Sequence, residues 1–152
     1  MRTVLISLAA AAAAVATPAM AGEGRVEARG GVVWGGGSSD EIAGVAAGYD
    51  WDLGGNAFGG LEVSGDKILT SNTRVSLGVA ARLGLKTSEA GKIYAVGSYQ
   101  SKFCKFCDDG VTLGAGYQHA LGGNVYGKVE YRHFFYNGTD VNTAGVGVGY
   151  KF

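Results

Sequence analysis

The sequence predicts an all-β fold, an eight-stranded antiparallel up-and-down transmembrane β-barrel, and three observations support this prediction. Apolar side chains alternate with polar or small ones at a period of two throughout residues 22–152. The alternation falls into eight segments of roughly ten residues, which is the number and length of strands in the smallest membrane barrels. The last segment, 142–152, is apolar on one face and ends with Tyr150 and Phe152 on that face.

Residues 1–21 precede the alternating region and have the features of a secretory signal peptide. Arg2 is followed by an apolar run over residues 4–16, and a small-residue sequence ends at Ala21. The alternative, an N-terminal membrane anchor, is disfavoured because the run is too short to span a bilayer as a helix. We therefore assign residues 1–21 to a signal peptide cleaved after Ala21 and residues 22–152 to the barrel domain.

The composition argues against several other classes of protein. Thirteen basic and 13 acidic residues give a formal net charge of +0, so nothing suggests a nucleic-acid partner. The 28 glycines would be compatible with disorder, but disordered chains usually lack regular hydrophobic alternation. No stretch after Ala21 is long and apolar enough for a transmembrane helix, so a membrane location would require a closed barrel.

The first three strands are predicted at residues 25–34, 42–52 and 57–65. In the first, apolar even positions alternate with charged odd positions: Val26, Ala28, Val32 and Trp34 against Arg25, Glu27 and Arg29. In the second, the odd positions from Ala43 to Trp51 are apolar. The third places Leu61 and Val63 opposite Glu62 and Ser64. Glycine-rich loops at 35–40 and 53–56 separate the three strands.

The fourth and fifth strands are predicted at residues 74–85 and 92–100. The fourth has the clearest alternation, with apolar residues at every odd position, while Arg74 and Arg82 lie on the other face. A helix would need apolar residues three and four positions apart and would scatter these arginines over its surface. The fifth segment alternates in the same way.

The last three strands are predicted at residues 110–119, 125–135 and 142–152. The sixth is apolar at its odd positions, and the seventh carries Lys128 and Arg132 on its polar face. Short glycine-containing turns precede the seventh and eighth strands.

An internal repeat links the hairpin of the second and third strands to that of the sixth and seventh. Its positions occur in the same register: Gly48, Tyr49, Leu53, Gly54, Gly55, Asn56, Gly59 and Glu62 correspond to Gly116, Tyr117, Leu121, Gly122, Gly123, Asn124, Gly127 and Glu130. We interpret the repeat as two four-strand halves of common origin, with chance similarity between glycine-rich hairpins as the alternative.

Aromatic residues of the apolar face lie at strand ends. On even-numbered strands they are Tyr49, Trp51, Tyr117, Tyr150 and Phe152, and on odd-numbered strands they are Trp34, Tyr99 and Phe135. Antiparallel strands would place these two sets at opposite ends of the barrel, as two aromatic girdles typical of membrane barrels. A soluble barrel would instead need large apolar side chains in the strand middles, which here hold mostly Val, Leu, Ala and Gly.

Together the eight strands, the repeated Gly-Tyr and Leu-Gly-Gly-Asn turns, Glu130-Tyr131-Arg132 and the terminal Gly-Val-Gly-Tyr-Lys-Phe resemble the small OmpA-type and opacity-type outer-membrane barrel family. The resemblance spans the barrel domain. It implies a monomer in the bacterial outer membrane, surrounded by lipid and lipopolysaccharide, with both termini in the periplasm. It also implies recognition by the barrel assembly machinery through Tyr150 and Phe152. The short loops and the lack of an appended periplasmic domain mean that neither peptidoglycan anchoring nor extended adhesive loops are carried over from the family.

With the apolar face outward, the polar face lines the interior. It gathers the charged residues Arg25, Glu27, Arg29, Glu62, Arg74, Arg82, Lys92, Lys128, Glu130, Arg132 and Lys151, with Tyr94 and Tyr126. An eight-stranded barrel is filled by its side chains, and buried charges need partners, so we expect a structural network of salt bridges. The alternative is a narrow gated ion path, in which an excess of basic groups would favour anions.

Cys104 and Cys107 lie in the predicted loop 101–109, outside the cell. In an exported protein we expect a local disulfide between them. A thioredoxin-like redox role would need a helix start in a βαβ context, and zinc would need further ligands.

Some eight-stranded barrels are lipid A deacylases with a His-x-Ser pair on a late strand. The corresponding stretch here, His133-Phe134-Phe135, has no nucleophile, so we expect no enzyme activity and no cofactor or metal. The expected function is structural or surface-interactive, through envelope integrity, contact with lipopolysaccharide and adhesion. The alternatives are a narrow low-conductance channel and, third, a soluble ligand-binding barrel.

Overall fold

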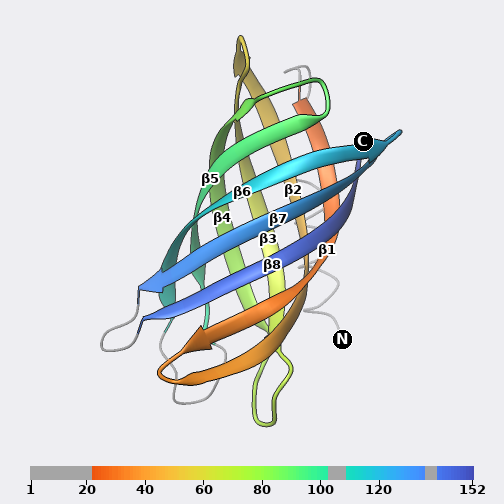
Figure 1. Ribbon diagram of the computed structural model, residues 1–152. Helices are drawn as coiled ribbons and strands as arrows, with labels where there is room; N and C mark the ends of the chain where they lie inside the picture. Colours follow the sequence, from red (N-terminus) through yellow and green to blue (C-terminus); the bar gives the residue numbers. More distant parts are fainter. Residues whose placement is uncertain (1–21, 103–108, 136–139) are drawn as a thin grey trace, which may run out of the picture.

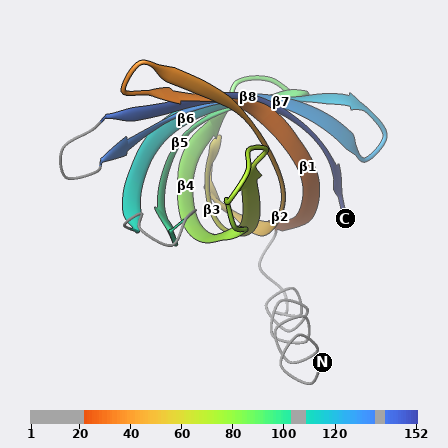
Figure 2. The same cartoon turned by 90° about the horizontal axis from the view of Figure 1, so that it is seen from below.

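The structure is a computed structural model that describes residues 22–102, 109–135 and 140–152. Eight antiparallel strands form a closed barrel in sequence order, and the last strand pairs with the first (Figure 1 and Figure 2). The strands are β1 (Gly22–Gly35), β2 (Ser38–Gly54), β3 (Ala57–Ile68), β4 (Ser76–Lys86), β5 (Gly91–Gln100), β6 (Gly110–Gly122), β7 (Val125–Phe135) and β8 (Val141–Lys151). This confirms the predicted all-β up-and-down barrel. Within the described residues, no helix has the length and apolar character needed to cross a membrane.

Each strand has one apolar and one polar face, and closure of the barrel turns the apolar faces outward. Leu77, Leu83 and Val146 are 67%, 61% and 62% exposed, whereas the inward-facing Arg82 is 3% exposed. Exposed apolar side chains occur on all eight strands. A continuous apolar surface is unfavourable in water but matches the hydrocarbon core of a bilayer. The barrel therefore has the faces expected of a membrane protein rather than of a soluble one.

The two repeated hairpins have the same turn geometry. The β2–β3 turn runs through Gly54 and Gly55, the β6–β7 turn runs through Gly122 and Gly123, and all four residues have positive φ. Glycine adopts this conformation without the steric cost that a Cβ atom would bring. Both hairpins also shift register by one residue just before the turn. The internal repeat in the sequence is thus also a repeat in structure.

The two ends of the barrel differ in their connections. The terminal end carries Gly22, Phe152 and three short turns, whereas the loop end carries the turn at Gly36, the connection that follows β3 and the last residues of β5 and β7 (Figure 1). Outward aromatic side chains mark both ends. They are Trp34, Tyr99, Tyr131 and Phe135 at the loop end and Tyr49, Trp51, Tyr117, Tyr150 and Phe152 at the terminal end. This arrangement agrees with the predicted girdles.

Several differences from the predicted strand boundaries affect charged residues. β2 begins at Ser38, which brings Asp40 and Glu41 into the strand. β1 begins at Gly22, which brings Glu23 into the barrel, and β3 continues to Ile68, which brings Asp66 into the strand. β4 begins at Ser76, so Arg74 lies in the preceding connection and is exposed. The prediction that Arg74 lines the interior is therefore wrong, because β3 and β4 pair only as far as Asp66 and Ser76 and no ladder holds residue 74 in the sheet.

The barrel closes between β1 and β8. Their paired residues run from Arg25 opposite Lys151 to Gly35 opposite Val141. Next to this ladder, Gly24 and Phe152 exchange two backbone hydrogen bonds of 2.9 Å. The ring of Phe152 covers Gly24, where an added Cβ atom would lie 2.5 Å from the ring. The last residue of the chain is thus part of the closing seam.

Candidate functional site: the charged interior

Glu62 lies at the centre of a cluster of arginines inside the barrel. It is on β3 and is 4% exposed. Its carboxylate accepts hydrogen bonds from Arg25 at 2.8 Å, from Arg29 at 3.0 Å and from Arg132 at 3.1 Å. Arg29 also donates two hydrogen bonds, of 2.8 and 2.6 Å, to Asp66 in a bidentate arrangement. These contacts join β1, β3 and β7 across the interior.

A second group of side chains surrounds Lys128 on β7. Its ammonium group forms ion pairs with Glu27 and with Glu130, the latter at 3.3 Å. Tyr126 donates a hydrogen bond of 2.7 Å to Glu27, and Tyr94 donates one of 2.7 Å to Glu130. Each carboxylate therefore has a cation and a phenol as partners, which offsets the cost of burying its charge.

Arg82 forms the next layer towards the terminal end. It donates two hydrogen bonds to Asp50, one of them 2.7 Å long. Its guanidinium group lies over the rings of Phe58 and Tyr94, at 5.4 and 4.9 Å from their centres. Arg25 Nε lies 3.6 Å from Asp50 Oδ1 and connects this layer to the Glu62 cluster. The middle of the barrel is therefore one continuous polar network.

The structure places most of the predicted interior residues inside the barrel, each with an ion-pair partner: Arg25, Glu27, Arg29, Glu62, Arg82, Lys92, Lys128, Glu130, Arg132 and Lys151. Arg74 is the exception. Three acidic partners were missed: Glu23, Asp50 and Asp66. Alternation alone could have found Asp50, which lies on the polar face of the predicted second strand. The other two fell outside the predicted strands.

The missed acids nearly balance the charge of the interior. Seven basic side chains pair with six acidic ones: Arg25, Arg29, Arg82, Lys92, Lys128, Arg132 and Lys151 with Glu23, Glu27, Asp50, Glu62, Asp66 and Glu130. The expected excess of basic groups is therefore reduced to one, and the preference of a channel for anions stays a prediction. Breaking one such buried pair would cost about 3–5 kcal/mol, because the remaining charge has no water to solvate it.

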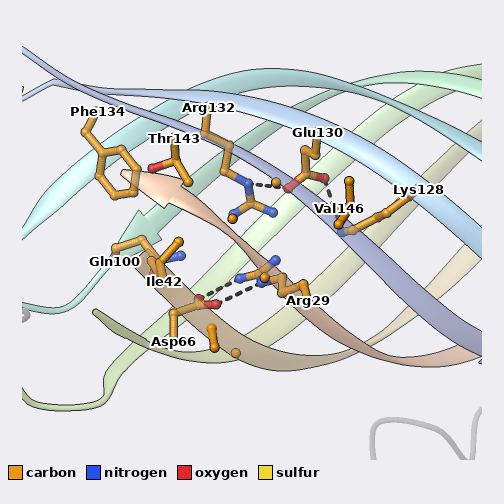
Figure 3. A pocket seen from close by; sticks show the side chains of 15 residues that line it. Arg29, Ile42, Asp66, Gln100, Lys128, Glu130, Arg132, Phe134, Thr143 and Val146 are labelled. Atoms are coloured by element: carbon orange, nitrogen blue, oxygen red, sulfur yellow. Dashed lines mark hydrogen bonds and ion pairs between the residues drawn. The ribbon is translucent and has the colours of Figure 1, made fainter. Parts of the chain in front are cut away.

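Two hollows flank the central network. Towards the loop end, a cavity of about 50 Å³ lies among Arg29, Gln100, Phe134 and their neighbours (Figure 3). At the terminal end, a wider hollow has a volume of about 430 Å³. Arg25 and Tyr126, both 0% exposed, belong to the network between them. The small cavity has room for a few water molecules only.

The remaining predicted features lie outside this network. Cys104 and Cys107 are outside the described residues, so their disulfide stays a prediction. His133 faces outward at the loop end, with Nδ1 2.8 Å from Asn142 Oδ1 and Nε2 3.7 Å from a carboxylate oxygen of Asp140. Among the residues that the structure describes, no group of His, Cys, Asp or Glu is arranged to hold a metal ion.

Comparison with known proteins identifies the family of this barrel. A family model described as the outer membrane protein beta-barrel domain matches residues 7–152. The chain belongs to this family. The resemblance to the small OmpA-type and opacity-type barrels is thereby confirmed, as is the location in the bacterial outer membrane. The comparison with curated proteins returned no match.

Several solved structures of outer-membrane barrels share the fold. The N-terminal β-barrel domain of OprF from Pseudomonas aeruginosa has a TM-score of 0.66 at 16% identity, over 86% of this chain and 97% of that chain. Ail, the attachment invasion locus protein of Yersinia pestis, has a TM-score of 0.57 at 16% identity, with the same coverage of 86% and 97%. Neisserial surface protein A has a TM-score of 0.55 at 14% identity, again over 86% and 97%. At these identities the likeness shows the fold alone.

Proposed function

We propose that this outer-membrane barrel has a structural and surface-interaction role. It supports the integrity of the envelope, contacts lipopolysaccharide at its outer rim and presents its loops for adhesion. The observation that best supports this role is the filled interior, where Arg25, Glu62 and Tyr126 are 0–4% exposed and joined in one network. A filled and nearly neutral interior leaves the outer surface and the loops as the parts available for interaction.

The proposal includes an orientation for the barrel. Residues 1–21 act as a signal peptide removed after Ala21, the terminal end faces the periplasm and the loop end faces the exterior. Tyr150 and Phe152 provide the signal that the assembly machinery recognises, and the barrel acts as a monomer. It acts without catalysis: the contacts of His133 are with Asn142 and Asp140, and neither is a nucleophile of the deacylase type.

A narrow channel is the second candidate function, and the two hollows favour it. Because a hollow lies on each side, the central network is the barrier to ions along the barrel axis. Rearrangement of its ion pairs would be enough to open a narrow path, which makes conduction the property that separates the two functions.

Conductance in planar bilayers tests the proposal. The wild-type barrel should give no single-channel steps in concentrated KCl, because its central network is filled. The double variant Arg25→Ala/Glu62→Ala removes two mutually paired side chains from that network and should give small steps, which shows that the assay detects an opened barrel. Heat-dependent gel mobility checks that the variant is folded. Salt-dependent steps from the wild type would replace the structural role with the channel.

A further inference from the structure

Three exposed cations at the loop end differ from the other basic residues. Lys67, Arg74 and Lys102 have no ion pair within the described parts of the chain. All the other described basic residues are paired: Arg25, Arg29, Arg82, Lys86, Lys92, Lys128, Arg132 and Lys151. The unpaired positive charge of the described barrel is therefore gathered at one end.

Lys67 and Arg74 flank the connection between β3 and β4. The two strands pair as far as Asp66 opposite Ser76, so both cations stand just beyond the last pair of the ladder. Within the connection, Thr73 Oγ1 donates to the carbonyl oxygens of residues 68 and 70, at 2.6 and 2.8 Å. These bonds hold Arg74 at the base of the connection, on the chain segment next to Lys67.

Lys102 joins this group from the segment that follows β5. Ser101 lies beside the start of β4, where its N–H donates to the carbonyl of Leu77 and its Oγ accepts from the Leu77 N–H, both at 2.8 Å. Lys102 is the next residue and is exposed. The three cations thus stand on neighbouring segments on one side of the loop end.

Lys67 has an unusual position for a charged residue. On the outward faces of the described strands, only Glu41 and Lys67 carry a formal charge. Two apolar neighbours, Val75 just before β4 and Leu77 on β4, are 58% and 67% exposed. An ammonium group is costly in hydrocarbon, but a lysine near the membrane surface can lay its stem along lipid tails and extend its charge to the headgroups.

We propose that Lys67, Arg74 and Lys102 form a binding site for the phosphates of a glycolipid headgroup in the outer leaflet. This inference rests on the proposed contact with lipopolysaccharide and locates that contact at the three cations. Two ammonium groups and one planar guanidinium group suit phosphates spaced on a sugar. The apolar side chains beside Lys67 suit the acyl chains of the same lipid. Glu41 is on the adjacent strand, and Asp40, Asp109 and Asp140 are also exposed at the loop end, so the site rests on the local group of three cations rather than on a net positive rim.

Binding of fluorescent lipid A to the folded full-length protein in neutral detergent micelles tests this site. Each single variant, Lys67→Gln, Arg74→Gln or Lys102→Gln, should weaken binding about fivefold, and the triple variant on the order of 100-fold. Lys86→Gln removes the same charge at the terminal end and is the matched control, which should bind as the wild type does. Millimolar inorganic phosphate is added as a competitor.

The outcomes separate the site from the broader function. Full binding by the folded triple variant would overturn the site while leaving the lipid contact in place. A wild-type protein that does not bind lipid A would overturn the proposed contact itself. Equal affinity for dephosphorylated lipid A would overturn phosphate recognition. Complete competition by millimolar phosphate would assign the three cations to free anions rather than to a lipid headgroup. The site is supported if the wild type and Lys86→Gln bind lipid A and the variants at Lys67, Arg74 and Lys102 lose affinity for it.

Discussion

Two buried tyrosines depend on glycines of the neighbouring strands. Tyr126 lies opposite Gly149 in the β7–β8 ladder, and Tyr94 lies opposite Gly116 in the β5–β6 ladder. In both places a Cβ atom on the glycine would overlap the phenol ring. The rings are held in place because their hydroxyl groups donate to interior carboxylates. A glycine without a side chain is therefore what lets each phenol lie flat across the next strand and reach the network.

This arrangement predicts an effect of the smallest substitution. Gly149→Ala and Gly116→Ala should each lower the free energy of unfolding by about 1–3 kcal/mol, because the phenol must move and its hydrogen bond is strained. Gly97→Ala is the control: its nearest neighbour, a carbonyl oxygen of Thr112, is 3.9 Å from the added atom. Urea unfolding in micelles measures the difference. Equal midpoints for all three variants would contradict the role of the two glycines.

At the scale of single residues, the alternation predicted whether a side chain faces inward or outward, but not which side chains it pairs with. It placed Glu62 inside, and the structure adds three arginines from β1 and β7 around it. It also placed Arg74 inside, where the structure has it exposed beyond the end of a strand. The direction of a side chain follows from the local pleat, whereas its partners come from strands far away in the chain.

The length of a strand depends on its pairing with neighbouring strands more than on its own sequence. Residues 66–68, Asp-Lys-Ile, have little apolar character, and the sequence alone predicts a loop there. In the structure they pair with β2, and the carboxylate of Asp66 is held by Arg29. The turns are different, because Gly54-Gly55 and Gly122-Gly123 specify their own geometry through positive φ. Turns were therefore more predictable than the strand ends at the loop side.

The last strand predicts a specific defect in assembly. Deletion of Phe152 removes two hydrogen bonds to Gly24 and the ring that covers it, so membrane insertion should fall sharply while secretion remains intact. Phe135→Ala is the control, since Phe135 is similarly exposed, at 54% against 57%, but lies at the loop end. Fractionation of cells into periplasm and outer membrane measures both variants. Normal insertion of the truncated chain would show that neither the seam nor an assembly signal needs Phe152.

In the whole molecule, the closed ladder and the filled interior act together. All eight strands have two neighbours, so the barrel has no free edge. The charges of β1, β3 and β7 meet in the middle, which ties opposite walls of the barrel to one another. Opening the barrel would expose both the backbone ladder and the paired charges to hydrocarbon, where neither is satisfied.

This architecture predicts resistance to detergent. The protein in the outer-membrane fraction should migrate differently in a detergent gel before and after boiling, because unheated detergent leaves the paired strands closed. The same gel should show loss of the shift at a lower temperature for Gly149→Ala than for Gly97→Ala. A protein recovered in the soluble fraction, with no shift on heating, would contradict the membrane barrel.

Residue alternation and glycine placement were enough to specify the number of strands, their inward and outward faces, the two girdles and the repeated turns, because these depend on backbone geometry over a few residues. Closure of the barrel decided the rest. The strand register brings Asp50 to Arg82 and Asp66 to Arg29, which offsets most of the positive charge of the interior, and it leaves Lys67, Arg74 and Lys102 unpaired at the rim. Such pairings span more than 30 residues of chain, so they follow from how the strands align around the barrel rather than from any local pattern.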